Sequence, residues 1–170
     1  MANLQTDIAA GIATTIQAAS FDTIFFDGAK AVDHAEVGYR ADDDPYKKFS
    51  HMLIRPLPPE PDPEATVHQA SERTLFPFDI MADIFDRSKA HETINVFTQL
   101  MLTNFADDGV ILSANITDNG TNLLDPQVTV EMGTPEIETA EVGPDGIVPL
   151  DNPRVTLPLI VGAWHKLPLA

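Results

Sequence analysis

Apolar side chains alternate with other residues through 76–85, and this pattern constrains the fold more than any other feature of the chain. The alternating positions are Phe76, Phe78, Ile80, Ala82 and Ile84. Successive side chains of a strand point to opposite faces of a sheet, so the period of two predicts a half-buried strand with these residues on its inner face. The opposite face is expected to meet solvent.

A helical repeat follows this strand directly. Its apolar residues stand three or four positions apart, at Ile94, Phe97, Met101 and Phe105. Ser88 can cap the start of the helix, and Gly109 marks its end. Strand and helix are therefore expected to pack together as the centre of the fold, from 76 to 105.

A second helix is predicted at 4–19. Leu4, Ile8, Ile12 and Ile16 lie four residues apart, which places them on one side of a helix. A glycine inside a helix, here Gly11, weakens it by about 1 kcal/mol relative to alanine. This helix is therefore expected to need a sheet or a neighbouring chain to hold it.

Short apolar or alternating runs predict further strands at 21–26, 49–57, 110–112, 128–132 and 155–163. The last run contains Pro158, which has no N–H to donate to a neighbouring strand. The strand at 155–163 is therefore expected at an edge of the sheet, where its free backbone groups can pair with another subunit.

These patterns predict a single α+β domain over residues 1–170, with a mixed or antiparallel sheet and two helices packed on it. The length of 170 residues and the hydrophobic content of 44% suit one core. Five prolines within 56–63 predict an extended arm or loop there. The stretch 136–152 is predicted to be an acidic loop region, with a turn at 143–146.

The charge of the chain disfavours several classes of partner. With 26 acidic and 10 basic residues the net charge is −16, so the surface repels nucleic-acid phosphates and anionic lipid. Three explanations of this acidity stand side by side: solubility, adaptation to high salt, and the wall of a channel past which DNA slides without sticking. Composition alone does not separate them.

No motif for chemistry is present in the sequence. The chain has no cysteine, which excludes disulfides, thiolate metal sites and cysteine nucleophiles. No Gly-rich phosphate loop or nucleophile elbow occurs. The five histidines lack the spacing of a zinc site: His34, His51, His68, His91 and His165. We therefore expect no enzymatic activity, with no catalytic, cofactor-binding or metal-binding residue and no cofactor.

The sequence also predicts no membrane association. The first residues lack the basic segment and apolar core of a signal peptide, and no apolar run approaches the roughly 20 residues that span a bilayer. The chain is therefore expected to be neither secreted by that route nor embedded in a membrane.

Four residues are the candidate subunit contacts. An arm with fixed φ loses little conformational entropy when it lies along a neighbour, which selects Pro58 and Pro61. Pro158 marks the expected edge strand. Trp164, beside that strand, fits either a core position or an aromatic anchor at an interface.

The order of the predicted elements resembles that of the tail-terminator, or tail-completion, proteins of tailed bacteriophages. A helix at 4–19 precedes strands, the strand at 76–85 leads into the helix at 90–105, and further strands end at 155–166. The resemblance covers most of the chain through element order and size. No motif carries a residue-level role across.

This resemblance implies a homo-oligomeric ring, a hexamer, that stops growth of the tail tube and faces the neck of the head. Its partners are then tail-tube and neck proteins, with DNA only as passing cargo and no membrane. Its place is the virion, assembled in the host cytoplasm. The alternatives are a capsid decoration or other neck protein and, from a different class, a small acidic binding module or unrecognised enzyme of a salt-adapted organism.

Overall fold

The computed structural model describes residues 4–19, 36–37, 53–64, 71–83, 90–105, 109–116, 123–124 and 127–166. The helices of this part are α1 (Leu4–Ala18), α3 (Ala90–Phe105) and α4 (Val110–Asn115). Its strands are β1 (Glu36–Val37), β2 (Leu53–Pro56), β3 (Glu60–Pro61), β4 (Ser71–Asp83), β5 (Thr129–Met132), β6 (Glu136–Gly143) and β7 (Gly146–Lys166). The predicted α+β class is confirmed.

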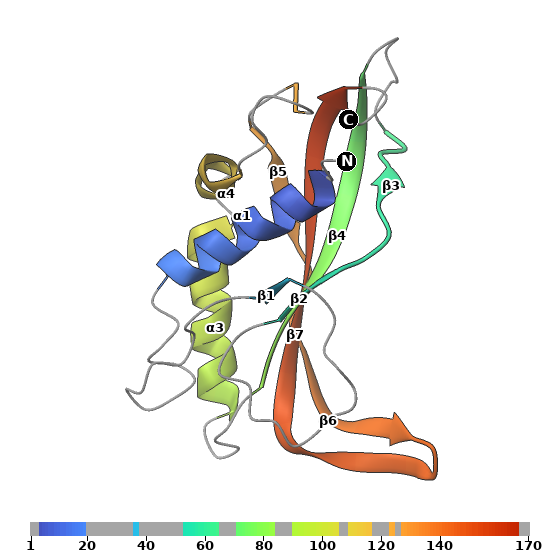
Figure 1. The fold of residues 1–170 in the computed structure, drawn as a ribbon. Coiled ribbons are helices and arrows are strands. Elements are labelled where there is room, and N and C mark those ends of the chain that lie inside the picture. Colours follow the sequence, from blue (N-terminus) through green and yellow to red (C-terminus); the bar gives the residue numbers. More distant parts are fainter. Residues whose placement is uncertain are drawn as a thin grey trace.

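One sheet contains all seven described strands. Its order is β1-β2-β4-β7-β5, while β3 pairs with β4 and β6 pairs with β7. Every pair is antiparallel except β1 with β2, so the predicted mixed or antiparallel sheet is confirmed. Strands β4 and β7 form its long axis, because all 13 residues of β4 lie opposite a residue of β7 (Figure 1).

The two central strands present one apolar face to the core. On β4, Phe76, Phe78, Ile80 and Ala82 are buried, and on β7 every second residue from Val155 to Ala163 is buried. Residues directly opposite each other share a face, so these two rows meet. The inner faces predicted from the alternation are confirmed, while Ile84 lies outside the described residues.

Apolar side chains of the helices join the same core. The predicted helical stripes are buried in α1 and, with Ile94 only partly buried, in α3. Gly11 has a packing role, because a Cβ at this position would lie 2.7 Å from a side-chain carbon of Ile116 at the end of α4. Glycine therefore weakens α1 locally but lets α4 approach it.

The predicted strand at 110–112 is wrong, because these residues begin helix α4. Only Leu112 is buried, whereas Val110 and Ile111 are exposed. The Ser113 hydroxyl donates to the Gly109 carbonyl at 2.5 Å and accepts from the Val128 N–H at 2.9 Å. These contacts join α4 to Val128, the residue before β5. They stabilise the helix even though Val110 and Ile111 are β-branched and favour a strand. The described chain consequently has three helices rather than the two predicted.

The prediction that Pro158 marks an edge strand is also wrong. Strand β7 is central, with β4 on one side and β5 and β6 on the other. The Pro158 carbonyl accepts from the Gly133 N–H at 2.8 Å, so the proline nitrogen faces the same side. On that side Pro158 faces the break between the end of β5 and the start of β6. The missing N–H therefore removes no hydrogen bond from the sheet.

Pro77 is accommodated in the same way on the other side of the sheet. Its carbonyl accepts from the Leu57 N–H at 3.0 Å, so its nitrogen faces 57–59, the break between β2 and β3. The strands on either side of this break, β2 and β3, both pair with β4. The Asp62 N–H continues the bonding by donating to the Arg73 carbonyl at 2.9 Å.

The acidic stretch predicted as a loop at 136–152 is instead a β-hairpin. Strand β6 and the first residues of β7 pair up to Gly143 and Gly146, which enclose a two-residue turn. The predicted turn at 143–146 is therefore confirmed. Alternation of acidic and apolar residues along β6 fits a strand. Gly143, Pro144 and Gly146 form the tip, whereas Pro149 pairs with Ala140 within the ribbon.

Some predictions fall on residues outside the described ranges. These are the strand at 21–26 and the Ser88 cap. Within the predicted strand at 49–57, β2 occupies 53–56, where Ile54 is buried as expected.

Candidate functional site

A depression of about 360 Å³ lies on the sheet face opposite the core. Its polar lining is Asp62, Glu64, Arg73, Thr129 and Glu131. Leu75 and Ile160 add apolar surface. The lining residues come from the end of β3 and from β4, β5 and β7. They are distant in sequence, and the register of the sheet brings them together.

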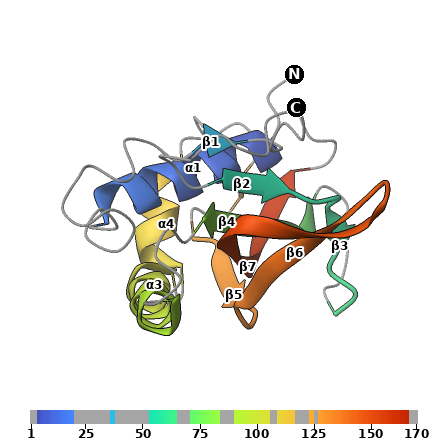
Figure 2. The ribbon, with the colours of Figure 1, turned by 90° about the horizontal axis from the view of Figure 1, so that it is seen from below.

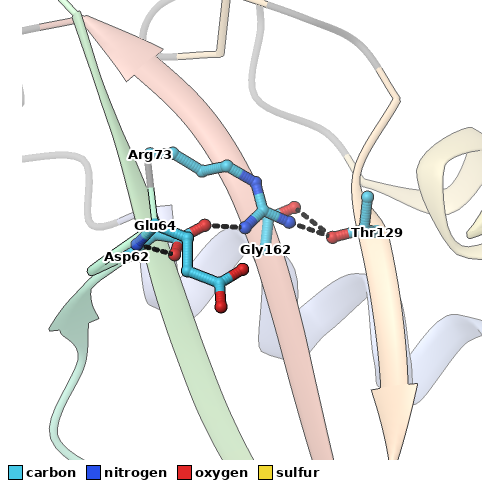
Figure 3. Close-up of polar contacts among 5 residues, drawn as sticks. All are labelled: Asp62, Glu64, Arg73, Thr129 and Gly162. Carbon is cyan, nitrogen blue, oxygen red and sulfur yellow. Dashed lines mark hydrogen bonds and ion pairs between the residues drawn. The ribbon is translucent and has the colours of Figure 1, made fainter. Parts of the chain in front are cut away.

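Arg73 bridges the two sides of this depression. Its guanidinium donates to an Asp62 carboxylate oxygen and to the Thr129 hydroxyl, the latter at 2.5 Å (Figure 3). To reach Thr129 the side chain passes over Gly162 of β7, where a Cβ would overlap the guanidinium. Glycine at this position is what allows Arg73 to cross the strand.

Asp62 is held as a carboxylate by its neighbours. The Glu64 backbone N–H donates to Asp62 Oδ1 at 2.9 Å, and Arg73 donates to Oδ2. The Glu64 hydrogen bond, followed by the bond and charge of Arg73, lowers the pKa of Asp62 below its ordinary value of 3.8. A carboxyl group with a lowered pKa is a poor proton donor at neutral pH. Asp62 and Arg73 therefore form a structural ion pair in the wall of the depression.

The lowered pKa of Asp62 predicts a pH-dependent contribution to stability. The carboxylate stabilises the fold above its unfolded-state pKa, and this contribution is lost as the pH falls through the lowered folded-state pKa. Asp62→Asn is therefore expected to melt below the parent at about pH 6 and to approach it at about pH 2.

Thermal melting followed by circular dichroism at each pH measures this difference. Glu64→Gln is the matched control, because it keeps the backbone N–H that Asp62 accepts from and changes only an exposed side chain. A melting difference for Asp62→Asn that stays constant over this pH range would contradict the role assigned to the carboxylate.

Two more arginines on this sheet face are bound to carboxylates. Arg55 pairs with Asp79 directly across the β2–β4 ladder, and Arg154 pairs with Glu138 at 3.7 Å across the β6–β7 ladder. Each arginine of the described part therefore has an acidic partner within the chain. These guanidinium groups bind carboxylates within the chain, and the net charge of the protein remains strongly negative.

His165 is a core residue with both ring nitrogens bonded. Its Nδ1 lies 2.9 Å from the Lys166 carbonyl oxygen, which can only accept, so Nδ1 carries the proton. Its Nε2 lies 2.6 Å from the Thr74 hydroxyl, which donates to it in the neutral ring. Both side chains are buried. The described residues contain no group of three His, Asp or Glu side chains placed to hold a metal ion.

The β6–β7 hairpin is the second candidate site. Strand β4 ends opposite Arg154, so from 153 back to the tip β7 pairs with β6 alone. Val142 and Ile147 lie directly opposite each other on one face of this ribbon and are 87% and 77% exposed. Ala140 and Pro149 extend the same face. Val148 lies on the other face.

The hairpin tip projects away from the body of the molecule. In both views it points to the side opposite α3 and α4 (Figures 1 and 2). Apolar side chains this exposed cost free energy in water and are typical of surfaces that another molecule covers. The hairpin is therefore a candidate surface for contact with another molecule.

The four candidate contacts from the sequence lie apart from this tip. Pro58 and Pro61 are exposed beside β4, whereas Pro158 and Trp164 are half-buried on one face of β7. Pro158 and Trp164 are six positions apart along the strand, or about 20 Å. The sequence prediction missed Val142 and Ile147, although the turn at 143–146 flanked by alternating residues was the signal for them.

Comparison of the chain with models of protein families gives no match, and no curated protein is similar to it in sequence. None of the described helices has the length and apolar character needed to cross a membrane.

Proposed function

We propose that the chain is a structural subunit of a virion, a ring-forming tail terminator at the head–tail neck or tail end that caps the tail tube. Its partners in this proposal are copies of itself, in a hexameric ring, and tail-tube and neck proteins. The virion is its location, after assembly in the host cytoplasm. DNA passes as cargo.

The projecting β6–β7 hairpin is the observation that carries the proposal. A protein that acts alone gains nothing from holding Val142 and Ile147 in water at the tip of a two-stranded ribbon. A subunit gains an interlocking contact, because the tip can reach a neighbour. The bonded arginines and the net charge of −16 further suit a wall that DNA passes without adhering.

A small acidic binding module is the second candidate, and the depression beside Arg73 favours it. In that case a ligand would have to compete with the bonds that Arg73 already makes to Asp62 and Thr129. This competition makes the depression a weaker argument than the hairpin. A capsid decoration or other neck protein would use the hairpin in the same manner as a tail terminator.

Shortening the hairpin tests the proposal. Glu138 and Arg154 face each other, so replacing 139–153 with Asn-Gly should close a new two-residue turn. The parent is expected to form a closed oligomer in size-exclusion chromatography with light scattering, and the shortened variant to be a folded monomer. A parent that stays monomeric both alone and with tail-tube or neck proteins would overturn the proposal.

A further inference from the structure

A second exposed apolar surface lies on α3 and α4. Val96 and Leu102 of α3 are 41% and 44% exposed, and Val110 and Ile111 of α4 are 56% and 38% exposed. The two helices contact each other, and both also supply buried residues to the core. The two helices thus hold uncovered apolar side chains on a rigid base.

The same helices are nearly free of acidic residues. Glu92 is the only acidic residue in 90–105 and 109–116, in a chain whose net charge is −16. The hairpin stretch 136–151, by contrast, has five: Glu136, Glu138, Glu141, Asp145 and Asp151. An acidic hairpin that meets another copy of this chain is repelled least where the acceptor has few carboxylates. Helix α1 also has a single acidic residue, Asp7, but among the described helices α3 and α4 alone combine this condition with exposed large apolar side chains.

The geometry prevents the two surfaces from meeting within one molecule. The hairpin tip and the helices α3 and α4 lie on opposite sides of the body (Figures 1 and 2). Two different surfaces that join across copies form a head-to-tail contact, which closes into a ring when the rotation between copies allows it. A contact of hairpin with hairpin would instead stop at a dimer and bring the acidic tips together.

We infer that the β6–β7 hairpin of one copy docks its Val142 and Ile147 face on the exposed apolar side chains of α3 and α4 of the next copy. This inference rests on the proposed function, since it names the contact that joins subunits of the ring. The partner at this surface is a second copy of the chain.

Two variants each remove one side of the contact. The hairpin variant carries Val142→Thr and Ile147→Thr, which keep β-branched side chains in the strands. Its matched control is Val148→Thr on the opposite face of the ribbon. The hairpin variant is expected to lose the ring and run as a monomer, while the control assembles as the parent does.

The helix variant carries Val96→Gln, Leu102→Gln and Val110→Ser, at exposed positions where these residues fit a helix. Its control is Ala10→Gln, at an exposed position of α1. The circular dichroism spectrum should match that of the parent for both, because no buried side chain changes. The helix variant is expected to be monomeric and its control to form the ring.

Mixing the two monomeric variants tests the head-to-tail arrangement. The helix variant keeps an intact hairpin, and the hairpin variant keeps intact helices, so an equimolar mixture should form a 1:1 dimer by light scattering, although neither variant associates alone. A helix variant that still forms the parent's ring, or a mixture that stays monomeric, would overturn this contact while leaving the proposed assembly standing. A monomeric parent would overturn the proposed function itself.

Discussion

Replacing Ile80 with aspartate is expected to destabilise the chain severely. Ile80 is fully buried on β4, opposite Ile54 of β2 on one side and Leu157 of β7 on the other. A carboxylate there has no partner and no water, which costs about 4 kcal/mol or more. Domains of this kind are stable by only about 5–15 kcal/mol, so this loss removes most of the stability of a domain near the lower end of that range.

Urea denaturation followed by circular dichroism measures this effect. Val148→Asp is the matched control, because it places aspartate on the same sheet at a residue that is 47% exposed and lies on the ribbon face opposite Val142 and Ile147. The control should stay within about 0.5 kcal/mol of the parent. An Ile80→Asp variant with the unfolding midpoint of the parent would show that the buried face of β4 is assigned wrongly.

The parts of the fold that the sequence predicted are those encoded by local period. The alternation at Phe76–Ala82 and at Val155–Ala163 marks the buried face because each strand needs only its own residues to define two faces. The stripes of α1 and α3 follow from the helical period for the same reason. No contact between distant residues was needed for these predictions.

The errors arose where a local rule depends on a distant strand. Pro158 lacks an N–H, but whether this excludes a central position depends on what lies beside it. Pro158 is tolerated in a central strand because it faces the break between β5 and β6, about 25 residues away in the chain. Periodicity does not reveal this break. Likewise Val110 and Ile111 favour a strand by their own preference, but the contact of Ser113 with the distant Val128 stabilises a helix instead.

The candidate site was beyond sequence reasoning for the same reason. Arg73 reaches Thr129 because the register places Arg73 opposite Trp164 and Thr129 opposite Gly162. Without that register nothing distinguishes Arg73 from any solvated arginine or Gly162 from a glycine in a turn. The β6–β7 hairpin could have been predicted from the sequence, since its two strands are adjacent in the chain. Its acidic and proline-rich composition hid a strand pattern that was present.

Replacing Gly109 with alanine is expected to destabilise the chain by about 2–4 kcal/mol. Gly109 has φ 75° and ψ 13°, a left-handed conformation that alanine adopts only with strain. An added Cβ would also overlap the Val128 carbonyl oxygen, which is backbone and has little room to move. Relief requires the start of α4 to shift away from β5, which disturbs the Ser113 bond to the Val128 N–H.

Gly146→Ala separates the two causes. Gly146 also has positive φ, at 119°, but a Cβ there meets no atom within 4 Å, and the residue lies at the exposed hairpin tip. Its strain can relax locally, so the free energy of unfolding should fall by about 1 kcal/mol or less. Equal losses in the two variants, measured by urea denaturation, would mean that backbone conformation alone explains both glycines. A larger loss for Gly109→Ala is the expected result, because its added Cβ meets the Val128 backbone and its strain cannot relax as it does at the hairpin tip.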